Sequence, residues 1–597
     1  MCASWAASLM GFLLTSLLAL LLGPVLATAF RRSDRVLAGL DGFVIAAIVG
    51  LVVLHILPHA VGAGGLWVMA AAVVGLLLPS VVERRLHGRG ARSAGRGVIA
   101  LIAIGLAIHA GLDGAALALP DDHHDDSGVL LAAGVILHRI PVGIAIWGAA
   151  RPLWGSLGAG LFVAFVAAAT AVGFGVGEEV LGALSGPFLG AFEALVAGTL
   201  LHVVAGHRLP ALASATPHRF VAGVGALLGV AVHVAILDTH FIPDADAGLP
   251  ASVTFTTLAL AAAPALLIGF AAVAGAAWVA SRGFWPRAAG RLARAARGVL
   301  SDVLGVIEPG ATPGGGAPRP LLGPLAILVS LPLLGSGATA TRVAIGLIVL
   351  FTLALARRQV VAPTGVSEGW RAQVMATVDH EAPWFVAGVA LAAMLEPVLP
   401  CSLFDTIAAP WQVVMAAAFA APWYLSASGM TPLAAVMLHK GASPGAVIVF
   451  LIVGAGVALR VPTCHDPAHR RAIRRDGAIT IAIVVVSAWI ADAIFARGDG
   501  LALHHEASLA PSAVAVVGAV ALGLLTVVAL LRQGPRGFIA QITGHGDDAH
   551  DDHDHAHDHA HDHDHDHDHD AAPHDHDPHD HDPHDHDGED RGGHRHG

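Results

Sequence analysis

Two ionisable side chains lie one helical turn apart in an otherwise apolar stretch, GLAIHAGLDGAALAL, which contains His109 and Asp113. A spacing of four residues places both side chains on one face of a helix. The next apolar stretch, ILHRIPVGIAI, contains His138 one turn before Pro141. A proline inside a helix removes a backbone hydrogen bond and frees carbonyl groups to face a ligand. Imidazole together with carboxylate is a ligand mixture that suits Zn²⁺ and other first-row divalent ions.

Other histidines stand near the ends of neighbouring apolar stretches. A lone histidine such as His233 is more often a packed residue than a metal ligand. Several histidines beside prolines or glycines on separate helices instead indicate a shared path, because ionisable groups are costly inside a bilayer. The sequence therefore predicts a metal site at His109, Asp113 and His138. Four more histidines are predicted to contribute: His55, His59, His202 and His207.

Two hydrophilic stretches also combine imidazole with carboxylate. The first, PDDHHDDS at 120–127, follows the His109 helix, and its negative charge is expected to concentrate cations at a pore mouth. Its predicted metal-entry residues are Asp121, Asp122, His123, His124, Asp125 and Asp126. The second is the His-Asp repeat of the tail, which lacks the apolar content to fold and is predicted to be disordered. Its predicted metal ligands are His553, His555, His557, His559, His561, His563, His565, His567 and His569.

The composition identifies the elements that must hold these groups. Of 597 residues, 55% are hydrophobic and 13% are charged, and the mean hydropathy is +0.69. Soluble domains average about 25% charged residues, whereas apolar stretches long enough to cross a bilayer recur along this chain. This composition excludes a soluble enzyme, a nucleic-acid binder and, with three cysteines, a disulfide-rich secreted protein. No catalytic motif stands out, so we do not expect an enzyme.

Hydropathy predicts eight spans in the first part of the chain and eight in the second. The first eight are 5–30, 41–62, 64–82, 97–119, 128–150, 153–177, 187–206 and 219–238. The second eight are 251–280, 321–336, 341–357, 383–400, 406–424, 444–460, 477–495 and 511–531. The stretch 425–443 is too polar for a simple span and is predicted to be re-entrant. Arginine-rich loops predict an extracytoplasmic N-terminus and a cytoplasmic tail.

The motifs of the first part resemble those of a known family. His109-x-x-x-Asp113-Gly114 and His138-Arg139-x-Pro141 are similar to the paired signatures of the ZIP (Zrt/Irt-like) metal transporters. The resemblance covers about residues 5–240 and implies an eight-helix bundle with its transport site on these two helices. Val142 stands where the family carries glutamate. Arg139 places a fixed positive charge where a second metal would otherwise sit.

The second part resembles another family over residues 379–454. The string DHEAPW at 379–384 and the stretch from Pro422 to Ala446 look like the second repeat of a predicted permease family, which includes copper/zinc-efflux-type and organoarsenical-efflux members. Ser426 stands where a cysteine is usual, and Lys440 is the only lysine in the chain. The motif residues that the resemblance implies are Tyr424, Ser426, Thr431, Pro432 and Lys440.

These observations predict an all-α, polytopic integral membrane protein of the inner (plasma) membrane. We expect a ZIP-like domain at 1–242, a permease-like helical bundle at 251–536 and a metal-binding tail at 541–597. The expected function is transport of divalent cations, zinc first, with nickel, copper and cobalt as other ions. Two alternatives stay open: an efflux permease for soft metals or metalloids, and a non-transporting metal-binding or sensing protein. We expect no prosthetic group and no nucleic-acid partner; lipid and metal ions are the expected partners, and a homodimer stays open.

Overall fold

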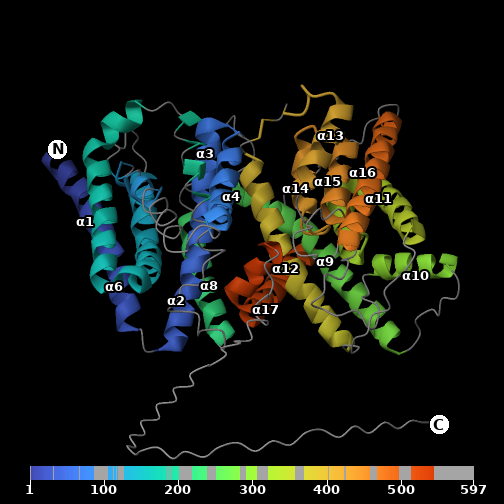
Figure 1. Cartoon of the computed structure of the whole chain (residues 1–597), viewed down its shortest axis with the longest axis horizontal. Coiled ribbons are helices and arrows are strands. Elements are labelled where there is room, and N and C mark those ends of the chain that lie inside the picture. Colours follow the sequence, from blue (N-terminus) through green and yellow to red (C-terminus); the bar gives the residue numbers. More distant parts are fainter. Residues whose placement is uncertain are drawn as a thin grey trace, which may run out of the picture. The chain divides into compact units, whose positions relative to one another are not determined.

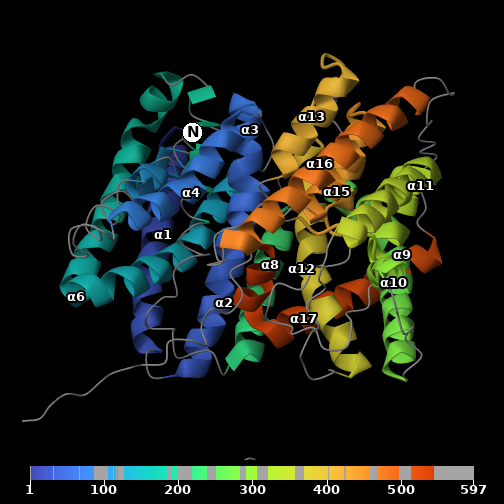
Figure 2. The same ribbon diagram turned by 45° about the vertical axis from the view of Figure 1, so that its right-hand side comes forward.

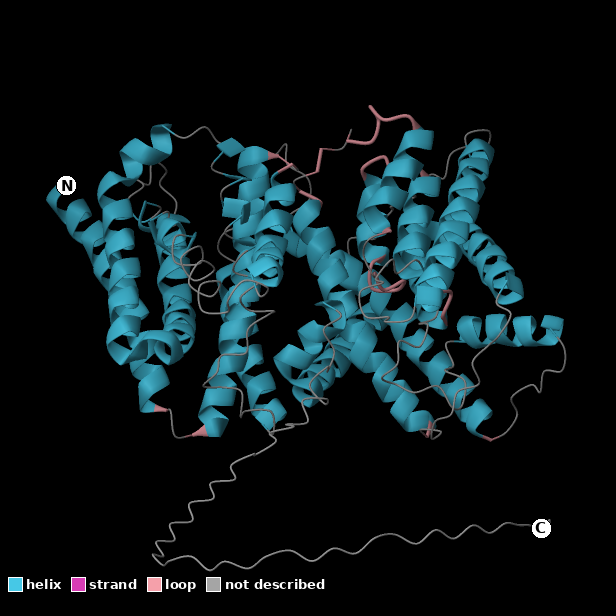
Figure 3. Ribbon diagram, viewed as in Figure 1, coloured by secondary structure: helices cyan, strands magenta, loops and turns pink. Residues whose placement is uncertain are grey.

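A computed structural model describes the helical body of the chain, and every regular element in it is a helix (Figure 3). All the described residues belong to one compact unit, Met1–Gly546. The described residues are 2–30, 33–65, 67–86, 105–117 and 187–201 with internal gaps, 127–183, 218–237, 251–282, 291–304, 321–356, 369–397, 399–400, 403–421, 425–456, 467–495 and 512–543.

The first part of the chain is built from long apolar helices (Figure 1). Their bounds are α1 (Cys2–Ala29), α2 (Asp34–Leu51), the π-helical turn η1 (Val52–Ile56), α3 (Leu57–Gly64), α4 (Val68–Leu86), α6 (Ser127–Ala183) and α8 (Arg219–Leu237). The turn η1 interrupts the predicted span 41–62 just before Pro58, whose missing N–H cannot continue the regular ladder. The backbone of His55 lies in this turn. Gly155 (φ 69°) divides α6 into two arms, close to the predicted boundary between 128–150 and 153–177.

The second part adds both long and short helices. Their bounds are α9 (Ala251–Ser281), α10 (Arg291–Leu304), α11 (Pro324–Ala356), α12 (Trp370–Leu395), α13 (Ala409–Ala420), α14 (Thr431–His439), α15 (Pro444–Gly456), α16 (Pro467–Phe495) and α17 (Ala513–Thr543). Positive-φ glycines break two of them, Gly335 in α11 and Gly534 in α17. The predicted re-entrant stretch 425–443 contains the short helix α14 between turns at 427–430 and 440–441.

Several helices depart from the predicted bounds, among them α17, which continues to Thr543 instead of ending at 531. Helix α12 begins at Trp370 rather than 383, and α16 begins at Pro467 rather than 477. Their first turns carry charged residues, which lower the hydropathy without preventing a helix. Helix α10 was not predicted, because an arginine-rich stretch with a narrow apolar stripe does not resemble a membrane span.

Six helices in the described part of the chain are long and apolar enough to cross a membrane. They confirm the prediction of an all-helical protein with membrane-crossing segments, while the full number of spans stays a prediction. The six segments are Met10–Ala29, Ala150–Val176, Val253–Ser281, Pro324–Leu353, Arg475–Ile494 and Ala513–Ile542.

Small residues allow α2 and α8 to pack closely, and the two helices lie side by side in both views (Figure 1, Figure 2). A Cβ atom added at Gly225 of α8 would lie 1.9 Å from the carbonyl oxygen of Gly39 in α2. Close backbone approach of this kind is typical of helix packing in membranes, where small side chains line the contact.

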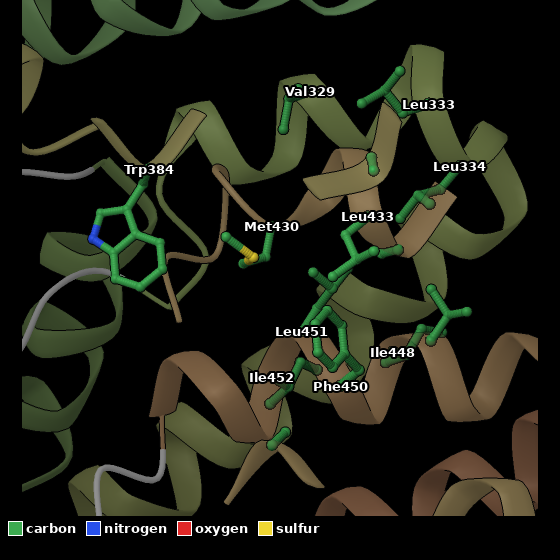
Figure 4. Close-up of a cluster of buried hydrophobic side chains, with 14 of the residues drawn as sticks. Val329, Leu333, Leu334, Trp384, Met430, Leu433, Ile448, Phe450, Leu451 and Ile452 are labelled. Carbon is green, nitrogen blue, oxygen red and sulfur yellow. The ribbon is translucent and has the colours of Figure 1, made fainter. Parts of the chain in front are cut away.

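Four hydrophobic clusters lie in the described part of the chain, and the two largest join several helices. The larger belongs to the second part of the chain, where Val329 and Leu333 of α11 pack with Leu433 of α14 and Phe450 of α15 (Figure 4). The smaller joins η1 and α3 to Met394 near the end of α12. Helix α12 therefore contributes side chains to both clusters.

An ion pair between distant parts of the chain ties α17 to α2. Arg536 Nε donates to Asp41 Oδ2 at 2.9 Å, and Arg536 Nη2 donates to Asp41 Oδ1 at 2.7 Å. The side chain of Asp41 is 8% exposed, whereas that of Arg536 is 32% exposed. Loss of the guanidinium would therefore leave a buried carboxylate without its counter-charge, whereas loss of the carboxylate would leave a guanidinium that still contacts solvent.

This asymmetry predicts unequal losses of stability. Arg536→Gln strands a buried carboxylate and should lower the free energy of unfolding by about 2–4 kcal/mol, whereas Asp41→Asn should cost about 1 kcal/mol. The double variant should recover most of the larger loss. Denaturation of the purified protein in detergent measures all three. Equal losses in the two single variants would contradict the burial argument.

Asp302, outside the six apolar segments, joins α10 to the start of α11. Its carboxylate accepts hydrogen bonds from the backbone N–H groups of Leu321 and Leu322, both at 2.8 Å. Burial raises the pKa of Asp302 to about 6, against these two hydrogen bonds, which lower it. Between about pH 3.8 and pH 6, Asp302 is therefore mostly protonated in the folded protein and mostly ionised in the unfolded chain.

The sign of this shift predicts a pH dependence of stability. The stabilisation from the raised pKa is complete below about 3.8 and is lost as the pH rises through about 6. Asp302→Asn cannot ionise, so the change in melting temperature between pH 5 and pH 8 should be smaller in this variant than in the wild type. Asp405→Asn, at an exposed carboxylate, is the matched control. An identical pH response of the Asp302 variant and the wild type would refute the prediction.

Candidate functional site

His109 and Asp113 lie as predicted on one face of the helical segment 105–117. His109 Nε2 is 3.5 Å from Asp113 Oδ2, and the two side chains are 9% and 13% exposed. The segment packs closely on the second arm of α6, because a Cβ atom added at Gly173 would lie 1.9 Å from the carbonyl oxygen of Gly111. This contact fixes the helix that carries both groups.

Arg139 of α6 reaches the same carboxylate oxygen. Its Nη2 lies 3.2 Å from Asp113 Oδ2 and 3.4 Å from the carbonyl oxygen of Ala110, and the side chain is 1% exposed. Imidazole and guanidinium thus meet at one oxygen atom. The sequence marked Arg139 as a fixed positive charge but did not pair it with Asp113. The signal was available, since a buried arginine requires an acceptor and Asp113 is the acid on the preceding span.

Several predicted metal ligands lie outside what the structure describes. The side chains of His55, His59 and His138 are in this class, although their backbones are helical. Other predicted site residues also lie outside the described residues: His202, His207, the entry residues at 121–126, Tyr424 and the tail histidines. Within the described residues, no three His, Cys, Asp or Glu side chains are grouped to hold a metal ion. The predicted metal site therefore stays a prediction.

A second polar cluster occupies the break between α13 and α14. Ser426 Oγ donates to Glu381 Oε2 at 2.9 Å, and Ser428 Oγ donates to the same oxygen. Ser426 is also a predicted motif residue, and Glu381 lies in the motif string at 379–384. Ser426 and Glu381 are 45 residues apart in the sequence, and the packing of α12 against α14 brings them together. The contact could therefore not be predicted from local spacing.

Arg342 of α11 holds the same break from the other side. Its Nη2 donates to the carbonyl oxygen of Ala427 at 2.6 Å, and its Nη1 donates to Thr431 Oγ1 at 3.2 Å. The side chain is buried, and Nη1 also donates to Ser330 Oγ and to the carbonyl oxygen of Ala326. Thr431 and Pro432 begin α14. Arg342 was not predicted as a site residue, although an arginine within an apolar span indicates a functional or structural role.

Lys440, the last of the predicted motif residues, ends α14 in an ion pair. Its Nζ lies 3.2 Å from Glu396 Oε1, and the two side chains are 1% and 5% exposed. The next turn is fixed by Asp492 of α16, which accepts from Ser443 Oγ at 2.8 Å and from the backbone N–H of Gly445 at 2.6 Å. Charged groups thus stabilise both ends of the short helix α14.

Comparison with protein-family models, curated proteins and solved structures finds no match to this chain. The two family resemblances therefore remain expectations from the sequence.

Proposed function

We propose that the protein transports divalent metal cations, zinc first, through the site at His109 and Asp113. The observation that carries the proposal is the meeting of His109 and Arg139 at one oxygen of Asp113. A neutral imidazole beside a carboxylate supplies nitrogen and oxygen ligands of the kind that Zn²⁺ accepts. Their burial among apolar side chains is a costly arrangement that favours a functional role.

Arg139 supplies the positive charge that Asp113 requires when no ion is bound. A divalent cation arriving at Asp113 repels the guanidinium, so binding requires the exchange of one cation for the other. This exchange sets a low resting affinity, which suits a site that must release its ion. His138, one residue before Arg139, would join the ligand set as the guanidinium leaves.

The remaining predictions complete this transporter. The proposal includes the full set of predicted spans, the re-entrant stretch 425–443, an inner-membrane location and a cytoplasmic tail that buffers metal. The acidic entry loop at 121–126, which follows the predicted span 97–119, would concentrate cations on the extracytoplasmic side, across the membrane from the tail.

Zinc flux into proteoliposomes tests the proposal. His109→Ala removes one ligand and should reduce flux at least tenfold at limiting zinc. His233→Gln is the matched control, because this buried histidine lies 2.7 Å (Nε2) from the carbonyl oxygen of Ala47 and is outside the site. Wild-type flux in the His109 variant would exclude this pathway.

A second candidate function is export of soft metals or metalloids through the second part of the chain. It is favoured by the buried hydroxyl groups of Ser426 and Ser428 and the partly buried carboxylate of Glu381 at a helix break, since discontinuous helices form substrate sites in transporters. Loss of export in Glu381→Gln, with normal export in His109→Ala, would favour this function over the first.

A further inference from the structure

An open cavity of about 460 Å³ lies among α8, α12 and α17. It is separate from both polar clusters described above. Helix α17 contacts both α8 and α12 and forms the wall between them. The lining residues with charged or amide side chains are Arg219, Arg371, Asp379, Arg532 and Gln533.

The cavity has an excess of positive charge. Three arginines face one carboxylate, and Arg532 already pairs with Asp379 and donates to the carbonyl oxygen of Met375 at 2.9 Å. Arg219 and Arg371 are exposed, and neither makes an ion pair with any residue that the structure describes. Among the described residues, the charges of Arg219 and Arg371 therefore have no carboxylate partner and are available to a ligand, and the Arg371 guanidinium also lies 5.4 Å from the centre of the Trp370 ring.

Two helices add their positive ends. Helix α8 begins at Arg219 and α12 begins at Trp370, so the first turns of both border the cavity. The unpaired N–H groups and the dipole of a helix N-terminus favour a negative charge nearby. Together with the arginines they favour phosphate, which arginine binds in bidentate fashion.

Exposed apolar side chains follow the first arginine of the cavity along α8. On α8, Phe220, Val224 and Leu228 follow Arg219 at helical spacing and are 63%, 40% and 60% exposed. Met375, which lines the cavity, is 38% exposed. The range 219–238 is a predicted span, and an exposed apolar stripe on such a helix would face acyl chains, with Arg219 at the start of that stripe. Under the topology predicted from the arginine-rich loops, these arginines stand at the cytoplasmic ends of their helices.

We infer that this cavity binds the phosphate-bearing headgroup of an anionic phospholipid, with the acyl chains along the apolar stripe of α8. Basic pockets between membrane helices on the cytoplasmic side bind such headgroups. The lipid would stabilise the junction where α17 meets α8 and α12.

Native mass spectrometry of the full-length protein tests the inference. Protein in detergent is supplied with phosphatidylglycerol or with phosphatidylcholine, and retained lipid is counted. The wild type should retain phosphatidylglycerol preferentially, and the double variant Arg219→Gln/Arg371→Gln should retain it at least tenfold less. The double variant Arg282→Gln/Arg475→Gln removes two exposed arginines outside the cavity and should behave as the wild type.

Three outcomes would overturn the inference. The first is equal retention in the cavity variant and the control. The second is equal retention of both lipids by the wild type. The third is full displacement of the lipid by millimolar inorganic phosphate, which would assign the cavity to the free anion. If the glutamine variant does not fold, the double variant Arg219→Lys/Arg371→Lys replaces it, because lysine keeps the positive charge and loses the bidentate geometry. This lysine variant must still retain more phosphatidylglycerol than phosphatidylcholine.

Discussion

Asp113→Asn should leave little folded protein and no zinc flux. The substitution removes the carboxylate oxygen that His109 and Arg139 share and leaves a guanidinium with 1% exposure without its counter-charge. Removing one partner of a buried ion pair costs about 3–5 kcal/mol. The yield of monodisperse protein after detergent extraction, followed by zinc flux in proteoliposomes, measures both effects.

A double variant separates folding from transport. Asp113→Asn/Arg139→Gln is neutral at both positions and should recover most of the lost stability. It should still fail to transport zinc, because the carboxylate is absent. Arg139→Gln alone keeps the carboxylate without its competitor and should bind zinc more tightly than the wild type, as measured by equilibrium binding. Transport by the double variant at the wild-type rate would show that Asp113 has only a structural role.

The sequence predicted the pair at His109 and Asp113 because one helix carries both groups. Spacing along a helix fixes their relation before any tertiary contact forms. Arg139 was the missing member, because its contact with Asp113 depends on how the first arm of α6 packs against the helical segment 105–117. Local periodicity carries no information on such a close approach.

The same distinction explains the second part of the chain. The motif residues Ser426, Thr431 and Lys440 were predicted from a resemblance, without their partners. Glu381, Arg342 and Glu396 each come from another helix. Hydropathy located most of the apolar helices, but it shortened α12, α16 and α17 at their charged ends and missed α10.

Glu396→Gln should destabilise the second part of the chain by about 3–5 kcal/mol, because it removes the carboxylate that pairs with the buried ammonium group of Lys440. The ammonium group is 1% exposed and lies 3.2 Å from the carboxylate that would be lost. Helix α14 ends at this ion pair, so its C-terminal turn should open before the rest of the helical bundle unfolds.

The only lysine in the chain makes this opening measurable. An amine-reactive ester can modify just the α-amino group and Lys440, so intact mass counts the exposure of a single side chain. The wild type should gain one label, whereas Glu396→Gln should gain two under native conditions. Lys440→Met/Glu396→Met replaces the pair by apolar groups of similar length and should regain most of the stability, since a buried ion pair adds little over a packed apolar pair. One label on Glu396→Gln, together with an unchanged free energy of unfolding, would mean that other groups suffice to hold Lys440 in place.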